Sequence, residues 1–152
     1  KDITIKDENG VEKTTKGYDT DAIYKAVSAF ADDYNSVLSA AAKSKNSSVV
    51  STASNMVQQT VANEKMLSRI GITIGEDNKL SVDEKKLKAA DMTTVKSMMN
   101  GNGSFAYGVQ TKASFISMYA KNDQNKASGV YGSSATYTAS LFSNGDIWNS
   151  FI

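Results

Sequence analysis

The sequence contains no Cys, no His and no Pro among its 152 residues. The absence of Cys excludes a disulfide framework, a zinc finger and a thiol nucleophile. The absence of His removes the commonest metal ligand and general base, and with it Ser-His-Asp and Cys-His catalytic machinery. The absence of Pro, the residue that most often breaks helices, favours long uninterrupted helices. The composition still allows a site for a hard cation built from oxygen ligands.

Charge and hydropathy exclude further classes of function. The 17 Lys and Arg residues nearly balance the 16 Asp and Glu residues, so the formal net charge is +1. This balance gives no reason to expect nucleic acid or an anionic membrane as a partner. No segment reaches the roughly 18 consecutive apolar residues that a membrane span needs. The length predicts a single domain. Because no convergent set of catalytic or binding residues is visible, no cofactor and no small-molecule substrate are expected.

Apolar residues recur at alternating spacings of three and four in two consecutive segments, separated by the polar residues 43–48. The first seam consists of Ile23, Val27, Phe30, Tyr34, Val37 and Ala41. The second consists of Val49, Ala53, Met56, Thr60, Asn63, Leu67 and Ile70, widened by Val50, Val57 and Val61. This period predicts a mostly α fold, built on an antiparallel, coiled-coil-like helical hairpin over about residues 20–70. Asn35 falls on the face expected to be solvated.

The hairpin belongs to a predicted helical domain over residues 18–120, preceded by an extended or β arm over residues 1–17. Residues 71–120 are expected to contain a β-turn element at 72–80 and further short helices. Ser81 and Glu84 match a capping box, and Ser104 is placed to cap a last helix ending near Ala120. Residues 121–152 are rich in Ser and Gly, with interspersed aromatics, and are predicted to form a tail.

Several patterns that suggest chemistry have a simpler structural explanation. The acidic loop 75–84 lacks the EF-hand spacing and is better explained as a turn followed by a helix cap. Asp32 and Asp33 are adjacent on a helix, so they point in different directions and do not form a converging catalytic pair. The glycines of segment 101–108 have the wrong spacing for a phosphate loop, which favours a hinge between helices. No catalytic, cofactor-binding or metal-binding residue is therefore assigned.

Two groups of apolar residues and two sequons remain as candidates for interaction or modification. The methionines Met92, Met98 and Met99 fit either core filling, which helical spacing favours, or an adaptable binding patch. The sequons at Asn46 and Asn102 are too short a pattern to carry weight. In the tail, the possible interaction residues are Tyr137, Phe142, Trp148, Phe151 and Ile152. These aromatics either fold back onto their own hairpin or dock on a neighbouring subunit or another partner.

Two stretches resemble the flagellar filament cap proteins, the family of hook-associated protein two. Residues 30–38 read FADDYNSVL and are similar to the family's helix with the pattern F-x-x-x-Y-N-x-hydrophobic. Residues 67–73 read LSRIGIT and residues 79–90 read KLSVDEKKLKAA, which resembles a C-terminal segment of that family. The match covers roughly residues 27–100. It departs at Asn78, where the family has Gly, and after Gly103, where a short helix and a tail replace a long coiled-coil helix.

The resemblance implies an extracellular bacterial structural protein of the flagellum that self-associates and contacts helical flagellar subunits. It implies no enzymatic activity, so no catalytic residue is transferred to this chain. The alternative is a stand-alone surface or cytoplasmic module that binds an unknown protein partner. In that case the tail is expected to pack on its own helical bundle.

Overall fold

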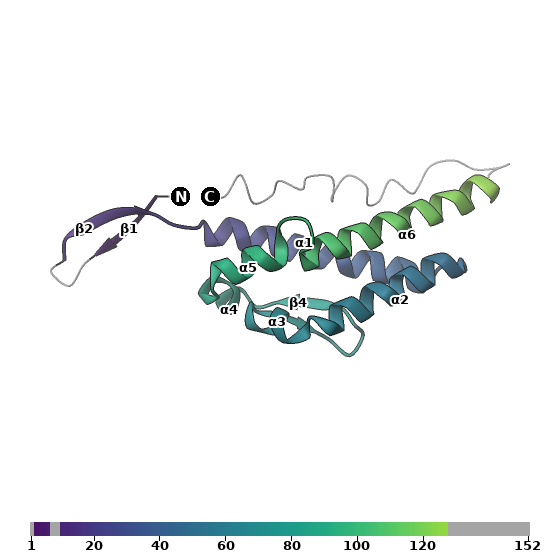
Figure 1. Cartoon of the computed structure of the whole chain (residues 1–152), viewed down its shortest axis with the longest axis horizontal. Helices are drawn as coiled ribbons and strands as arrows, with labels where there is room; N and C mark the ends of the chain where they lie inside the picture. Colours follow the sequence, from purple (N-terminus) through teal and green to yellow (C-terminus); the bar gives the residue numbers. More distant parts are fainter. Residues whose placement is uncertain (1, 7–9, 128–152) are drawn as a thin grey trace.

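The structure is a computed structural model that describes residues 2–6 and 10–127. Strands β1 (Asp2–Lys6) and β2 (Glu12–Lys16) form an antiparallel hairpin in which Thr4 lies opposite Thr14. Figure 1 shows this hairpin projecting beyond the first turn of the helix that follows it. An extended arm was predicted over residues 1–17, and the described part of that segment is a β hairpin.

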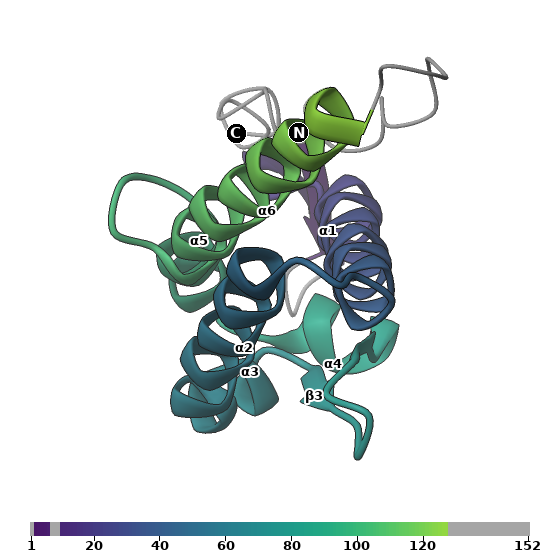
Figure 2. The same ribbon diagram turned by 90° about the vertical axis from the view of Figure 1, so that its right-hand side faces the viewer.

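Three long helices form the body of the molecule: α1 (Thr20–Ala42), α2 (Ser47–Ala62) and α6 (Phe105–Ala127). Helices α1 and α2 run in opposite directions, as the hairpin prediction requires, and α6 lies across both (Figures 1 and 2). The most extensive helix packing is between α2 and α6, whereas α1 and α2 contact each other less. The fold is mostly α with a small β element, as predicted, and the last helix, α6, is a third long helix that packs on the predicted hairpin.

Side-chain caps begin the three long helices. Asp19 accepts a hydrogen bond from the Ala22 N–H at 3.2 Å, and Asn46 accepts from the Ser48 and Val49 N–H groups at 2.8 and 3.2 Å. Ser104 accepts from the Tyr107 N–H at 3.1 Å. These side chains satisfy N–H groups that have no partner within the helix, and the cap at Ser104 is the one that the sequence predicted.

The core follows the two predicted seams closely. On α1 the buried side chains are Ile23, Val27, Ala31, Tyr34, Val37 and Ala41. Phe30, which was placed in the seam, is half-buried and packs edge-on against Phe105 of α6 at 6.0 Å between ring centroids. The second seam is buried at Val49, Ala53, Met56, Thr60, Leu67 and Ile70. From α6, Val109, Ala113 and Ile116 complete this core.

The second predicted helix is not continuous to Ile70. It breaks at Asn63, which separates α2 from the short helix α3 (Glu64–Arg69). The Asn63 side chain donates to the Gln59 carbonyl at 2.8 Å, and its N–H donates to the Thr60 carbonyl at 3.0 Å. A polar side chain that bonds to the backbone one turn earlier competes with the regular helical pattern. The prediction of two unbroken helices was therefore wrong at this residue.

A small antiparallel sheet closes the side of the body opposite α6. It pairs β3 (Ile72–Ile74) with β4 (Leu80–Val82), followed by α4 (Glu84–Ala89) and α5 (Met92–Met99). In Figure 2, β3 and α4 lie below α1, whereas α5 lies beside α6. The predicted capping box was wrong: the Ser81 hydroxyl hydrogen-bonds to Thr73 across the sheet at 2.7 Å. Asp83 caps α4 instead, accepting from the Lys86 N–H at 2.9 Å.

Helix α6 is longer than the sequence suggested. It has 23 residues, as many as α1, and it extends to Ala127 where an end near Ala120 was predicted. Residues 121–127, which were assigned to the tail, are therefore helical. Gln, Asn, Asp and Lys dominate this last stretch, so its helical period is not visible in apolar residues. Residues 128–152 lie outside the described part of the chain.

Candidate functional site

The predicted interaction residues are not placed by the structure. Tyr137, Phe142, Trp148, Phe151 and Ile152 all lie outside the described residues. The candidate site is therefore built from three features of residues 10–127. These are a hydrogen-bonded junction between α1 and the β3–β4 hairpin, an apolar groove between α1 and α2, and the outward surface of α6.

The junction is formed by Asn35, a residue that the sequence placed on the solvated face of α1. Its amide Nδ2 donates to the Leu80 carbonyl at 2.8 Å, and its Oδ1 accepts from the Leu80 N–H at 2.7 Å. Both backbone groups of this strand residue are thus satisfied by one side chain. The sequence prediction of a solvated Asn35 was therefore wrong, because a polar residue on a helix face gives no signal of a partner 45 residues away.

Gly71 fixes the other end of the same hairpin. Its φ of +83° lies in the left-handed region, and its carbonyl accepts from the Asp83 N–H at 2.8 Å. A Cβ atom at this position would approach the backbone N of Leu87 to 2.8 Å. Only glycine combines this backbone conformation with such close contact. Residues 70–72 (IGI) and residues 83–87 (DEKKL) are therefore in direct contact through Gly71.

Lys88 links α4 to the beginning of α1. Its Nζ lies 2.5 Å from a carboxylate oxygen of Asp21 and 2.5 Å from one of Glu84, and 5.6 Å from the centre of the Tyr24 ring. Hydrogen bonds to Asp21 and then Glu84 raise the Lys88 pKa above its ordinary value. The ammonium group remains charged, so this cluster is an ion-pair contact and contains no free base.

Asp32 and Asp33 do not converge on a common point. Asp33 is partly buried, and burial, followed by repulsion from Asp32, raises its pKa above the ordinary value of 3.8. Asp32 instead lines a wide, shallow depression of about 700 Å³ with Ser36, Ser39, Lys43 and Lys79. The depression contains one carboxylate and two exposed lysines. These groups do not form the contact between a nucleophile and a base that a catalytic site needs.

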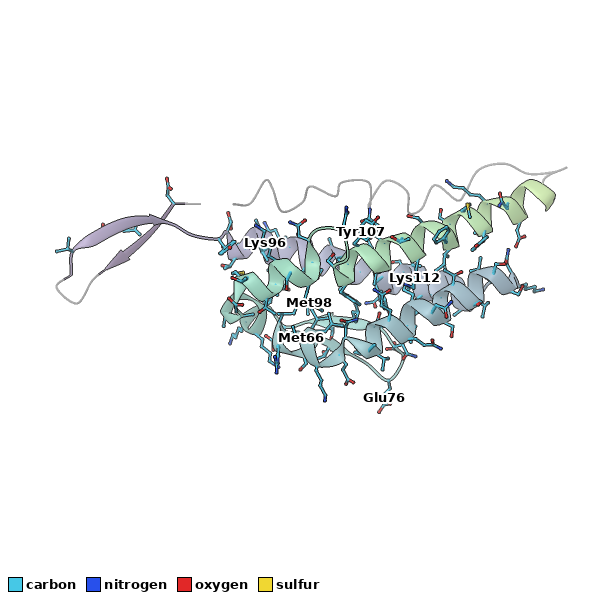
Figure 3. All side chains as sticks on the ribbon, viewed as in Figure 1. Met66, Glu76, Lys96, Met98, Tyr107 and Lys112 are labelled. Carbon is cyan, nitrogen blue, oxygen red and sulfur yellow. The ribbon has the colours of Figure 1, made fainter. Side chains whose placement is uncertain are left out.

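The acidic loop between β3 and β4 behaves as a turn. Asp77 accepts from the Lys79 N–H at 3.1 Å, and Asn78 adopts a left-handed φ of 62°. Glu76 projects from the tip of this turn away from the helices (Figure 3). Within residues 2–6 and 10–127, no group of three or more acidic residues is arranged to hold a metal ion.

The candidate methionine patch is mainly part of the core. Met98 and Met99 are buried, and Met92 is partly buried against the same cluster. Helical spacing with Val95, which is fully buried, indicated this arrangement in the sequence. The adaptable binding patch is therefore not found at these residues.

An apolar groove lies between α1 and α2. Its volume is about 260 Å³, and its lining contains no charged residue: Leu38, Ala41, Ala42, Val50, Ala53, Ser54, Val57 and Asn78. Val50 and Val57, which were predicted to widen the second seam, line this groove rather than the core. Val50 is 48% exposed. Small side chains on both helices leave room between them for one large apolar group.

The outward surface of α6 carries exposed large apolar side chains. Tyr107, Phe115 and Met118 are 47%, 46% and 44% exposed, and we call these three residues the outer face of α6. Figure 3 shows Tyr107 on the side of α6 away from α2, whereas Lys112 reaches towards α2. The Lys112 Nζ donates to the Gln59 Oε1 at 2.6 Å. The sequence did not identify this surface.

No protein-family model matches the chain, and no curated protein or solved structure matches it significantly. Within the described residues, no helix is both long and apolar enough to cross a membrane.

Proposed function

We propose that the chain is a non-enzymatic assembly module of the flagellar-filament-cap type, which associates with copies of itself through the outer face of α6. On this proposal it acts outside the bacterial cell and contacts helical protein subunits. The observation that carries the proposal is the exposure of three large apolar side chains on one long helix. No described element packs over them.

The spacing of the outer face suits helix-to-helix contact. Tyr107 and Met118 are separated by 11 residues, three turns of helix, and therefore lie near one line along α6. Phe115 lies to one side of that line and stacks with Tyr119 at 6.4 Å between ring centroids. Exposed aromatic and methionine side chains are the types enriched at protein interfaces. The near-zero net charge leaves packing of side chains as the main source of affinity.

The two stretches that resemble the cap family also support the proposal, because they contact each other in the fold. Asn35 of the first stretch binds Leu80 of the second. Within the second stretch, the Gly71 carbonyl accepts a hydrogen bond from the Asp83 N–H. The resemblance thus falls on residues that shape one continuous junction, rather than on unrelated surface positions.

The proposal is tested by measuring the mass of the whole chain in solution as its concentration is raised. We expect a mass above that of the monomer, and we expect polar substitutions on the outer face of α6 to return it to the monomer. A chain that stays monomeric at all concentrations would overturn self-association and favour a module that binds another protein.

A further inference from the structure

The apolar groove between α1 and α2 has a lining suited to a short uncharged segment. Its volume of about 260 Å³ matches one large side chain, and its lining residues are alanine, valine, leucine, serine and asparagine. An uncharged groove gives no attraction for a charged peptide, and burial of a charge in it would be costly. The occupant is therefore expected to be apolar or aromatic.

The groove opens beside the loop that joins its two helices. Ala42 ends α1 and Ser47 begins α2, and both Ala42 and Val50 line the groove. The same loop also contacts the last turns of α6. The Asn46 Nδ2 donates to Asp123 Oδ2 at 2.5 Å and lies 3.5 Å from the Tyr119 carbonyl. The C-terminal part of α6 is thus held against this loop, whereas the groove, which Asn78 of the β3–β4 turn also lines, opens on the side of α2 away from α6.

We infer that the segment 137–142 of the same chain docks into this groove. Helix α6 ends at Ala127, four residues or about 6 Å beyond the Asn46 contact. Tyr137 follows ten residues later, and an extended chain of that length reaches about 33 Å. The groove runs from Val50 to Val57, about 10 Å along α2. The chain between Ala127 and Tyr137 is therefore long enough to pass around the 43–46 loop and bring Tyr137, Leu141 and Phe142 to the groove.

Composition and tethering favour this occupant over others. Among residues 128–152 the only charged side chain is Asp146, so the segment matches the uncharged lining. Attachment to α6 also raises its local concentration at the groove to the millimolar range. A second copy present at micromolar concentration would be outcompeted. Docking in the same chain leaves the outer face of α6 untouched, so this inference is independent of the proposed function.

Because the sequence contains no Cys, a pair of introduced cysteines tests the contact directly. The test pair is Ser54→Cys, inside the groove, with Ser140→Cys, between Tyr137 and Leu141. The matched control is Ser51→Cys with Ser140→Cys, since Ser51 is exposed on the same helix but does not line the groove. Both variants are oxidised as whole chains in a glutathione buffer, and the products are separated by mass.

We expect the Ser54 pair to form an intramolecular disulfide at least tenfold faster than the Ser51 pair. Adding Val50→Glu to the Ser54 pair should abolish that advantage, whereas adding Val61→Glu, equally exposed but outside the groove, should preserve it. Equal rates for the two pairs would overturn the inference. Disulfide-linked dimers from the Ser54 pair would also overturn it, because the occupant would then be a second copy. Light scattering on the uncrosslinked chain reports self-association separately.

Discussion

The side-chain amide of Asn35 makes the two hydrogen bonds to Leu80 that a neighbouring β-strand would make. The donor and acceptor distances are 2.8 and 2.7 Å, and Leu80 is only 4% exposed. One helix residue thus completes the edge of the β3–β4 sheet. Paired in this way, Leu80 can enter the core without leaving unsatisfied backbone groups.

The variant Asn35→Ala should lower the free energy of unfolding by about 2–4 kcal/mol, because it leaves two buried backbone groups without partners. Urea denaturation followed by circular dichroism measures this change. Asn55→Ala, an exposed position on α2, is the control and should change stability by less than about 0.5 kcal/mol. Equal stability of the Asn35 and Asn55 variants would show that the junction does not hold the sheet.

The variant Gly71→Ala should lower the free energy of unfolding by at least about 2 kcal/mol. A left-handed backbone costs an alanine about 1–2 kcal/mol, and its Cβ would also contact the backbone of Leu87. Gly101→Ala is the matched control, because Gly101 has a similar φ of +87° but open space around its Cβ position. We expect Gly101→Ala to lower the free energy of unfolding by less than Gly71→Ala does, by about 1–2 kcal/mol for the left-handed backbone alone. Thermal unfolding of the two variants distinguishes the contact from the backbone conformation, and equal losses would argue against the contact.

The buried hydroxyl of Tyr34 should be dispensable for folding. Tyr34 is fully buried, and its hydroxyl forms no hydrogen bond within the described residues. Burial raises the Tyr34 pKa, and the neighbouring Thr60 hydroxyl lowers it by a smaller amount. The Thr60 hydroxyl donates its own proton to the Met56 carbonyl at 2.9 Å. Tyr34→Phe should therefore be neutral or stabilising by up to about 1 kcal/mol. A clear decrease in the free energy of unfolding, measured by urea denaturation, would indicate that the hydroxyl has a hydrogen-bond partner.

Asp33 should make stability depend on pH in the opposite sense to a salt-bridged carboxylate. Its pKa is higher in the folded chain than in the unfolded chain, so the folded state binds the proton more tightly. The associated stability is present at low pH and is lost as pH rises through the folded pKa. Asp33→Asn should therefore stabilise the protein at pH 7 relative to wild type, with the difference shrinking towards pH 3. Chemical denaturation at both pH values measures it, and Asp32→Asn should give a smaller effect.

The period of apolar residues predicted the helices because burial on one face leaves a signal in every turn. The sequence also predicted the cap at Ser104, since a cap side chain acts within three residues. Prediction failed at Asn35, whose partner is 45 residues away, and at Asn63, where a local hydrogen bond interrupts a regular pattern. It also failed to separate the groove from the core, because Val50 and Val57 have the same hydropathy whether or not a third helix covers them.

The central claim is that copies of this chain associate through the outer face of α6. The most direct test is the mass by light scattering of the wild type and of a variant carrying Tyr107→Ser, Phe115→Ser and Met118→Ser, across a hundredfold range of concentration. We predict that wild type rises above 16.3 kDa, the mass of one chain, and that the variant stays there with an unchanged circular dichroism spectrum. Val61→Ser, equally exposed on α2, should behave as wild type. A wild type that remains at the monomer mass, or a variant that associates as wild type does, would contradict the account.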